Sequence, residues 1–134
     1  MKSEIVQERI MVTDAPNELL LVPAIINGSR TYNFIVDTGA SCCCLSEEAA
    51  KELNIKDCKK VAASGANGNL SAHQGILDSI SIGKAHQKNL EVAIFDFSSL
   101  RKADKSIGGI IGHNFLCHYI VTINYRENIL VLEN

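Results

Sequence analysis

The chain has 134 residues, 46% of them hydrophobic, and its 15 acidic and 13 basic side chains give a formal charge of −2 at pH 7. This length and apolar content suit a single domain over residues 1–134, within which residues 1–17 are a segment without an assigned role. The dispersed charges give no electrostatic reason to expect a nucleic acid or an anionic membrane as partner.

The start of the chain and its apolar runs indicate a cytoplasmic protein. The first ten residues lack the apolar core of an export signal. The longest apolar run, residues 19–26, is much shorter than the ~18 residues of a membrane span. The five cysteines include three in a row at positions 42–44 but no Cys-x-x-Cys pair, which argues against a disulfide framework or a zinc knuckle. We expect reduced thiols and protein or peptide partners.

The first part of the chain predicts strands joined by turns. Residues 5–12 and 19–26 read as strands, and Pro23, which lacks an N–H, predicts an edge or a bulge at its position. Residues 27–30 then supply turn chemistry, because an Asn-Gly step tolerates positive φ values. The next strand, residues 32–36, therefore pairs with residues 19–26 as a hairpin and ends just before Asp37.

The middle of the chain predicts a short helix and then hairpins. Ser46 is a suitable cap for a helix over residues 47–53, which has acids in its first turn. Residues 62–75 are rich in Gly, Ala, Ser and Asn and predict a hairpin with a mobile tip. Alternating runs at 76–82 and 90–97 flank a turn at Gly83 and Lys84.

The last third predicts a polar loop, a brief helix and a final hairpin. The polar loop spans residues 98–106, and the helical stretch spans residues 113–118. Residues 121–125 and 129–132 flank the final turn. The fold class is therefore all-β, mostly strand with one or two short helices.

Two motifs together resemble the retropepsin family of single-domain aspartic proteases. They are Asp37-Thr38-Gly39-Ala40, which follows the apolar run Phe34-Ile35-Val36, and Ile110-Ile111-Gly112, which continues as His-Asn-Phe-Leu. A lone Asp-Thr-Gly is weak because ordinary Asp turns produce it often, whereas the two motifs in this order are specific. The resemblance covers roughly residues 19–132 and implies a closed barrel of the acid protease fold.

The resemblance also implies roles for individual residues. Asp37 would be catalytic, and Thr38, Gly39 and Ala40 would support its loop, with the Thr38 hydroxyl bonding across a subunit interface. Ile110, Ile111 and Gly112 would pack beneath that loop. Residues 64–70 are the candidate flap over an extended peptide, with Ser64, Gly65, Ala66, Asn67 and Gly68 as the substrate-binding residues.

The sequence departs from the family pattern in three places. Retroviral enzymes usually carry a second acid after the Ala, and Ser41 stands there instead. The stretch between the two motifs is longer than in the viral enzymes. Residues 62–75 contain no tyrosine, although a flap tyrosine covers the substrate in pepsins.

Peptide hydrolysis without a metal or covalent intermediate needs one group to accept a proton from water and another to donate one. Two close carboxylates do both, because they share one proton and titrate as a pair. Asp37 is the only Asp followed by Thr-Gly or Ser-Gly. A homodimer would therefore bring two Asp37 side chains together on its twofold axis. Such an aspartic endopeptidase, a hydrolase, needs neither a metal nor another cofactor.

Less specific interpretations stay open at this point. Asp37 alone suits a turn residue that accepts backbone N–H groups, and a dimer of this fold without activity would serve as a peptide-binding or protein-binding module. Cys42, Cys43 and Cys44 suit apolar packing better than redox or metal chemistry. His113, Cys117 and His118 include a zinc-like spacing, but no further ligand is positioned to complete the set.

Overall fold

The computed structural model describes residues 8–11, 13–14, 19–55, 59–65 and 68–134. Eleven strands and three short helices form in these residues. They are β1 Glu8–Met11, β2 Thr13–Asp14, β3 Leu20–Ile26, β4 Arg30–Val36, β5 Cys43–Ser46, α1 Glu47–Glu52, β6 Lys59–Gly65, β7 Gly68–Ile82, β8 Ala85–Phe95, α2 Ser98–Ala103, β9 Ile107–Ile111, α3 His113–Leu116, β10 Ile120–Asn124 and β11 Ile129–Glu133.

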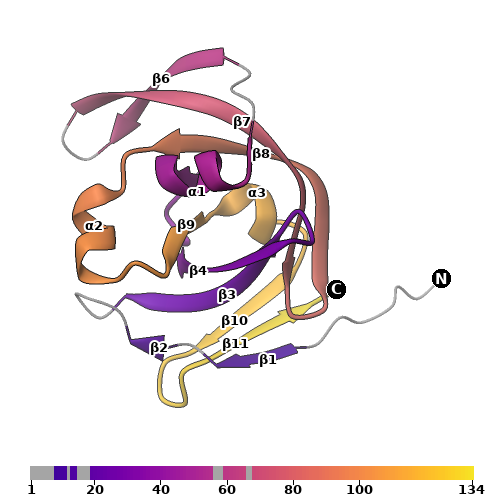
Figure 1. The fold of residues 1–134 in the computed structure, drawn as a ribbon. Coiled ribbons are helices and arrows are strands. Elements are labelled where there is room, and N and C mark those ends of the chain that lie inside the picture. Colours follow the sequence, from indigo (N-terminus) through magenta and orange to yellow (C-terminus); the bar gives the residue numbers. More distant parts are fainter. Residues whose placement is uncertain (1–7, 12, 15–18, 56–58, 66–67) are drawn as a thin grey trace.

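The strands form a closed barrel and a separate small sheet. Eight strands are ordered β2-β3-β4-β9-β5-β8-β7-β6, and an additional pairing of β3 with β7 closes the six strands from β3 to β7 into a barrel. The β6–β7 hairpin extends beyond the barrel at one end, and the sheet β1-β11-β10 lies at the other (Figure 1). The all-β, closed-barrel prediction is confirmed.

The barrel interior follows from strand alternation. In β3 the residues Val22, Ala24 and Ile26 are fully buried, whereas Pro23 and Ile25 between them are exposed. Alternating side chains lie on opposite faces of a strand, so one apolar face lines the main core. Phe34 and Phe115 are its largest fully buried side chains.

Pro23 occupies the kind of position that its chemistry predicts. It pairs with Asn33 of β4, and it lies between the residues of β3 that pair with β2 and those that pair with β7. On that side of the strand no ladder partner is recorded at Pro23 among the described residues, so its missing N–H leaves no broken ladder bond. The edge prediction at this residue is confirmed.

The predicted loop over residues 98–106 is wrong in its first part, because α2 spans Ser98–Ala103. This helix has no fully buried residue, and its N-cap Phe97 makes no side-chain capping bond. It is held instead by a second apolar cluster on the outside of the barrel, where Phe97 and Leu100 pack against a core of Leu21, Ile35 and Ile107. Because the segment is mostly polar, the sequence did not indicate that Phe97 and Leu100 would hold a helix here.

Candidate active site

Asp37 lies in a tight turn at the end of β4. Its backbone N–H donates to the Ile111 carbonyl at 3.1 Å, which continues the parallel β4–β9 ladder by one residue. Its carbonyl accepts from Ala40 N–H at 3.1 Å, and its side-chain Oδ1 accepts from Gly39 N–H at 2.9 Å. The backbone is thus fixed on both sides of an exposed carboxylate.

Thr38 and Gly39 sit at the exposed tip of this turn. A Cβ on Gly39 would stand 3.3 Å from Asp37 Oδ1, close to the atom that the Gly39 amide already binds. The absence of a side chain therefore leaves the amide free to approach the carboxylate. Thr38 projects from the same turn without burial, so its hydroxyl is available to a partner surface.

Gly112 allows two backbone segments to cross directly beneath the loop. A Cβ at this position would lie 2.8 Å from both the Ala40 and the Cys42 carbonyl oxygens. The next residue, His113, donates its N–H to the Ala40 carbonyl at 2.8 Å. In the segment Ile110–Gly112, Ile111 and Gly112 are buried and Ile110 is half-buried.

Asn114 is a site residue that sequence reasoning missed. Its Oδ1 accepts the Cys43 N–H at 2.7 Å, and its Nδ2 donates to the Glu91 carbonyl at 2.8 Å. One amide therefore joins the end of the Asp37 loop to β8, through a donor and an acceptor that only Asn or Gln supplies together. The sequence signal that could have identified Asn114 is its position two residues after Gly112 of the second motif.

Of the three adjacent thiols, Cys43 belongs to the main apolar core, whereas Cys42 and Cys44 are half-buried. Cys43 is fully buried, and its Sγ accepts from Gly112 N–H at 3.2 Å. Burial raises the pKa of Cys43 to about 11 and that of Cys44 to about 12, and it also raises the pKa of Cys42. Neutral thiols are poor nucleophiles, so the exposed ionisable group of this loop is Asp37.

The candidate flap is the β6–β7 hairpin (Figure 1). Ser64 and Gly65 end β6, Gly68 begins β7, and Gly65 pairs with Gly68 across the turn. Ala66 and Asn67 lie outside the described residues. The stem of this hairpin is continuous with the barrel, because the 15-residue strand β7 also pairs with β3 at Ile80 and Ser81.

His113 of α3 and the Cys and His residues just after this helix do not form a recognisable metal centre. His113, Cys117 and His118 are exposed, and Cys117 Sγ lies 3.8 Å from the Asn114 carbonyl. In the described part of the chain no group of three or more His, Cys, Asp or Glu side chains is placed to hold a metal ion. Likewise, none of the described helices has the length and apolarity to cross a membrane.

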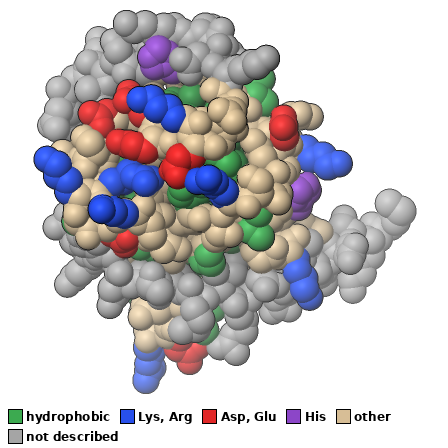
Figure 2. Space-filling view, viewed as in Figure 1, with side chains coloured by type: hydrophobic (Ala, Val, Ile, Leu, Met, Phe, Trp, Pro, Cys, Tyr) green, Lys and Arg blue, Asp and Glu red, His purple; other side chains and the backbone are tan. Residues whose placement is uncertain are grey.

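Two surface hollows of one subunit lie away from Asp37. A hollow of about 650 Å³ lies between α1 and the β7–β8 pair, where Lys51, His73 and Ile94 contribute to its lining. Another of about 480 Å³ is lined by Arg30, Arg101 and other polar side chains, on the face where charges of both signs gather around the helices (Figure 2). Neither hollow includes Asp37.

Comparison with known proteins identifies the family. The profile of the aspartyl protease family matches residues 22–115, so the chain belongs to this family. Its fold is similar to that of a retropepsin-like aspartic protease from Rickettsia conorii, with a TM-score of 0.68 and 22% identity over 99% of this chain and 96% of that one. It is also similar to EIAV protease complexed with the inhibitor HBY-793, with a TM-score of 0.58 and 20% identity over 80% and 93% of the two chains. No curated protein sequence matches the chain at a significant level.

Proposed function

We propose that this protein is an aspartic endopeptidase that works as a homodimer, with Asp37 of each subunit forming one catalytic pair. The observation that carries the proposal is the Asp37 turn, which holds an exposed carboxylate on a fixed backbone. A single subunit supplies one such group, and acid–base hydrolysis needs two. A twofold axis beside Asp37 provides the second one from an identical chain.

The two carboxyl groups would share one proton, because two negative charges at close range are unfavourable. The ionised Asp37 accepts a proton from water as the water oxygen attacks the peptide carbonyl carbon. The protonated Asp37 of the partner subunit donates its proton to the carbonyl oxygen, which gives a neutral tetrahedral diol. The diol then collapses as Asp37 gives its proton to the nitrogen and the ionised Asp37 of the partner subunit takes the proton of one diol hydroxyl. The C–N bond breaks, an amine and a carboxylic acid leave, and the pair again holds one proton.

The remaining site residues would hold the substrate and the pair. The β6–β7 hairpin would close over an extended peptide, and its small residues permit that movement. The exposed Thr38 hydroxyl would bond across the interface and fix the separation of the two carboxylates. We propose a cytoplasmic location, which suits a chain whose described cysteines, Cys42, Cys43, Cys44 and Cys117, are free thiols.

A second function of another class is favoured by one specific observation. Ser41 stands where retroviral enzymes usually carry an acid that contacts the substrate. A dimer of this fold that holds peptides without cutting them would also use the hairpin and the exposed turn. The two functions differ in the fate of the bound peptide.

The test is cleavage of a denatured protein mixture between acidic and neutral pH. We expect the natural chain to cut it and Asp37→Asn to lose cutting by at least a thousandfold, because the amide cannot take the water proton. Sedimentation should show the same dimer in both proteins, since an Asn Oδ1 still accepts the Gly39 N–H. Cutting by Asp37→Asn would exclude the aspartic mechanism, and peptide binding without cutting by either protein would identify a binding module.

A further inference from the structure

The hollow beside α2 (the α2 hollow) carries more positive than negative charge. Its volume is about 480 Å³, and all eight residues that line it have polar side chains. Its cations are Arg30, Arg101 and Lys105, and its single acid is Glu52, so its local formal charge is +2. The whole chain has a formal charge of −2. The α2 hollow is therefore a positive site on a chain whose net charge is negative.

Arg101 is held in place by oxygen atoms but faces no acid. Its Nη1 donates to the Ile107 carbonyl at 2.8 Å and to Oγ of the fully buried Ser46 at 3.4 Å. No bond is recorded for its Nη2 or Nε, and among the described residues no carboxylate lies within ion-pair distance of it. A guanidinium has five N–H donors, and a partly buried cation is normally paired. Since Arg101 lines the α2 hollow, its remaining donors are available to an anion bound there.

The other side of the α2 hollow shows how an anion is held. Arg30 Nη1 donates to Glu52 Oε2 at 2.7 Å, and the Tyr32 hydroxyl donates to Glu52 Oε1 at 3.3 Å. Glu52 thus neutralises Arg30. Lys105 is exposed and makes no recorded bond to the described residues. Two positive charges, those of Arg101 and Lys105, are therefore left without an acid in the described part of this hollow.

We propose that the α2 hollow binds the phosphate group of a small, sugar-like molecule, with the phosphate between Arg101 and Lys105. A phosphate monoester carries a charge of about −2 at neutral pH, which balances these two cations, and both side chains form charge-assisted bonds to phosphate oxygens. The volume lies within the roughly 300–1,000 Å³ of small-molecule sites. Because the lining is polar throughout and includes the hydroxyls of Ser29 and Thr31, a hydrophilic body suits it better than an aromatic or acyl one.

The α2 hollow is separate from Asp37 but is joined to it by two strands. β4 begins at Arg30 and ends one residue before Asp37, so an extended strand of roughly 20 Å separates the two residues. β9 begins at Ile107, whose carbonyl accepts from Arg101. Its last residue, Ile111, accepts the N–H of Asp37. The phosphate site therefore goes beyond the proposed function, and a ligand there would leave the catalytic turn open.

The experiment is an NMR titration of the ¹⁵N-labelled chain with ribose 5-phosphate at fixed pH and ionic strength. We expect one saturable site per chain, with the largest amide shifts at residues 29–32 and 101–106. Ribose, which lacks the phosphate, should cause no saturable shifts. Inorganic phosphate should shift the same signals with weaker affinity, because it lacks the body that contacts the hydroxyls. Equal affinity for inorganic phosphate would reject the sugar-like body and assign the α2 hollow to free phosphate.

Three charge-removing variants locate the site. Arg101→Gln should weaken binding about tenfold, because it removes charge-assisted bonds to the phosphate. This variant also loses the bond to Ile107, so Lys105→Gln is the second test, since Lys105 is exposed and makes no recorded bond to the described residues. It should weaken binding about threefold. Lys102→Gln is the matched control, because Lys102 is exposed on α2 but does not line the α2 hollow.

The outcomes separate this site from the protease proposal. Unchanged binding in both Arg101→Gln and Lys105→Gln, or no saturation by ribose 5-phosphate, would overturn the phosphate site and leave the proposed function intact. Equal weakening by Lys102→Gln would also overturn it, because the effect would then follow the overall charge of the chain. Asp37→Asn should bind ribose 5-phosphate as the natural chain does, so binding by a chain that cuts nothing would support the phosphate site and reject the protease.

Discussion

At the scale of residues, burial separates the ionisable groups around the Asp37 turn. The carboxylate of Asp37 is exposed and accepts one N–H from its own turn. The thiol of Cys43 is fully buried a few residues later, and burial raises its pKa to about 11. One loop thus presents an acid to the outside and keeps an uncharged sulfur inside.

The raised pKa of Cys43 predicts a loss of stability in alkali. Unfolded thiols release their protons near pH 9, whereas the folded Cys43 holds its proton to about pH 11. The native state therefore binds more protons in this window, and the free energy of unfolding falls as pH rises, by at most about 1.4 kcal/mol per pH unit for this thiol. Below pH 9 the buried Cys43 thiol makes its full contribution to the free energy of unfolding.

Urea unfolding at several pH values and one protein concentration measures this effect. Cys43→Ala should show a shallower fall in unfolding free energy between pH 9 and pH 11 than the natural chain, whatever its stability at pH 7. Cys117→Ala removes an exposed cysteine and is the control. If the unfolding free energy of Cys43→Ala falls with pH as steeply as that of the natural chain, the raised pKa of Cys43 would be contradicted.

At the scale of elements, the sequence indicates most strands because their pattern is local. The runs on either side of Gly83 form the β7–β8 hairpin, and Gly83 has the positive φ of 58° that its turn requires. The helix α2 escaped prediction because its support comes from Leu21 and Ile35, which are distant in sequence. Tertiary contacts of this kind leave no periodic signal in a short polar segment.

The residues of the candidate site also differ in whether local sequence or tertiary contacts determine their roles. Asp37, Gly39 and Gly112 are recognisable because backbone geometry dictates their types at fixed places in two motifs. The bridging role of Asn114 depends on β8 passing beside α3, which no spacing in the sequence reveals. The sequence therefore predicts the turn and its supporting glycines but not the amide that ties them to the barrel.

Asn114 links three elements, so its loss should affect both stability and chemistry. Asn114→Ala leaves the part-buried Cys43 N–H and the Glu91 carbonyl without this partner, which costs about 1–3 kcal/mol in thermal or urea unfolding. The loosened loop should lower kcat in peptide cleavage with little change in KM, since Asn114 positions the turn and does not touch the substrate. Asn114→Asp keeps the oxygen that accepts the Cys43 N–H, so its stability and kcat should lie between those of the natural chain and those of Asn114→Ala. Natural stability and kcat in Asn114→Ala would contradict the bridge.

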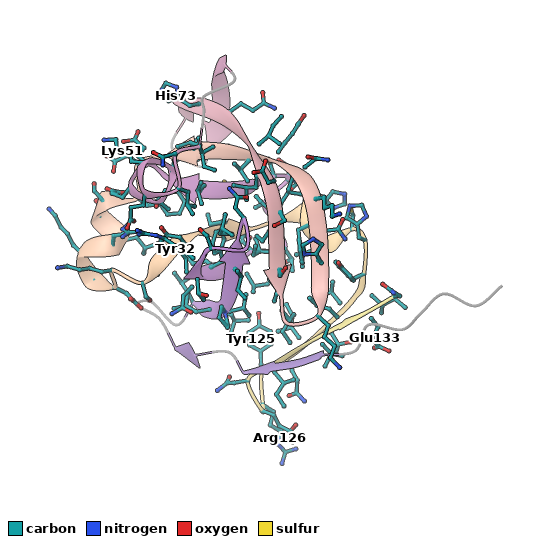
Figure 3. All side chains as sticks on the ribbon, turned by 45° about the vertical axis from the view of Figure 1, so that its right-hand side comes forward. Tyr32, Lys51, His73, Tyr125, Arg126 and Glu133 are labelled. Carbon is teal, nitrogen blue, oxygen red and sulfur yellow. The ribbon has the colours of Figure 1, made fainter. Side chains whose placement is uncertain are left out.

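At the scale of the whole molecule, the barrel carries two separate elements at its opposite ends. The β6–β7 hairpin extends from one end, and the β1-β11-β10 sheet occupies the other (Figure 1). In Figure 3 the labelled Arg126, in the turn after β10, projects away from the barrel. The proposed flap and the small sheet are therefore separate, and each can be altered without touching the other.

A two-subunit site predicts that activity depends on protein concentration. Below the dissociation constant of the dimer, the cleavage rate should rise with the square of the protein concentration, because the active species forms from two chains. Above that constant, the rate should become linear. Dilution series of peptide cleavage, read beside sedimentation of the same samples, measure this. A linear rate throughout a range in which the protein is monomeric would contradict a shared site.

Three bonds within a single chain shape the Asp37 turn, and their partners are Gly39, Ala40 and Ile111. In the proposed dimer, a chain that carries Asp37→Asn would still accept the Gly39 N–H and would therefore keep the surface on which its neighbour docks. In a cell that makes equal amounts of intact and altered chains, random assortment leaves only about one quarter of the pairs with both acids. A single altered gene copy would then suppress much of the product of the other copy.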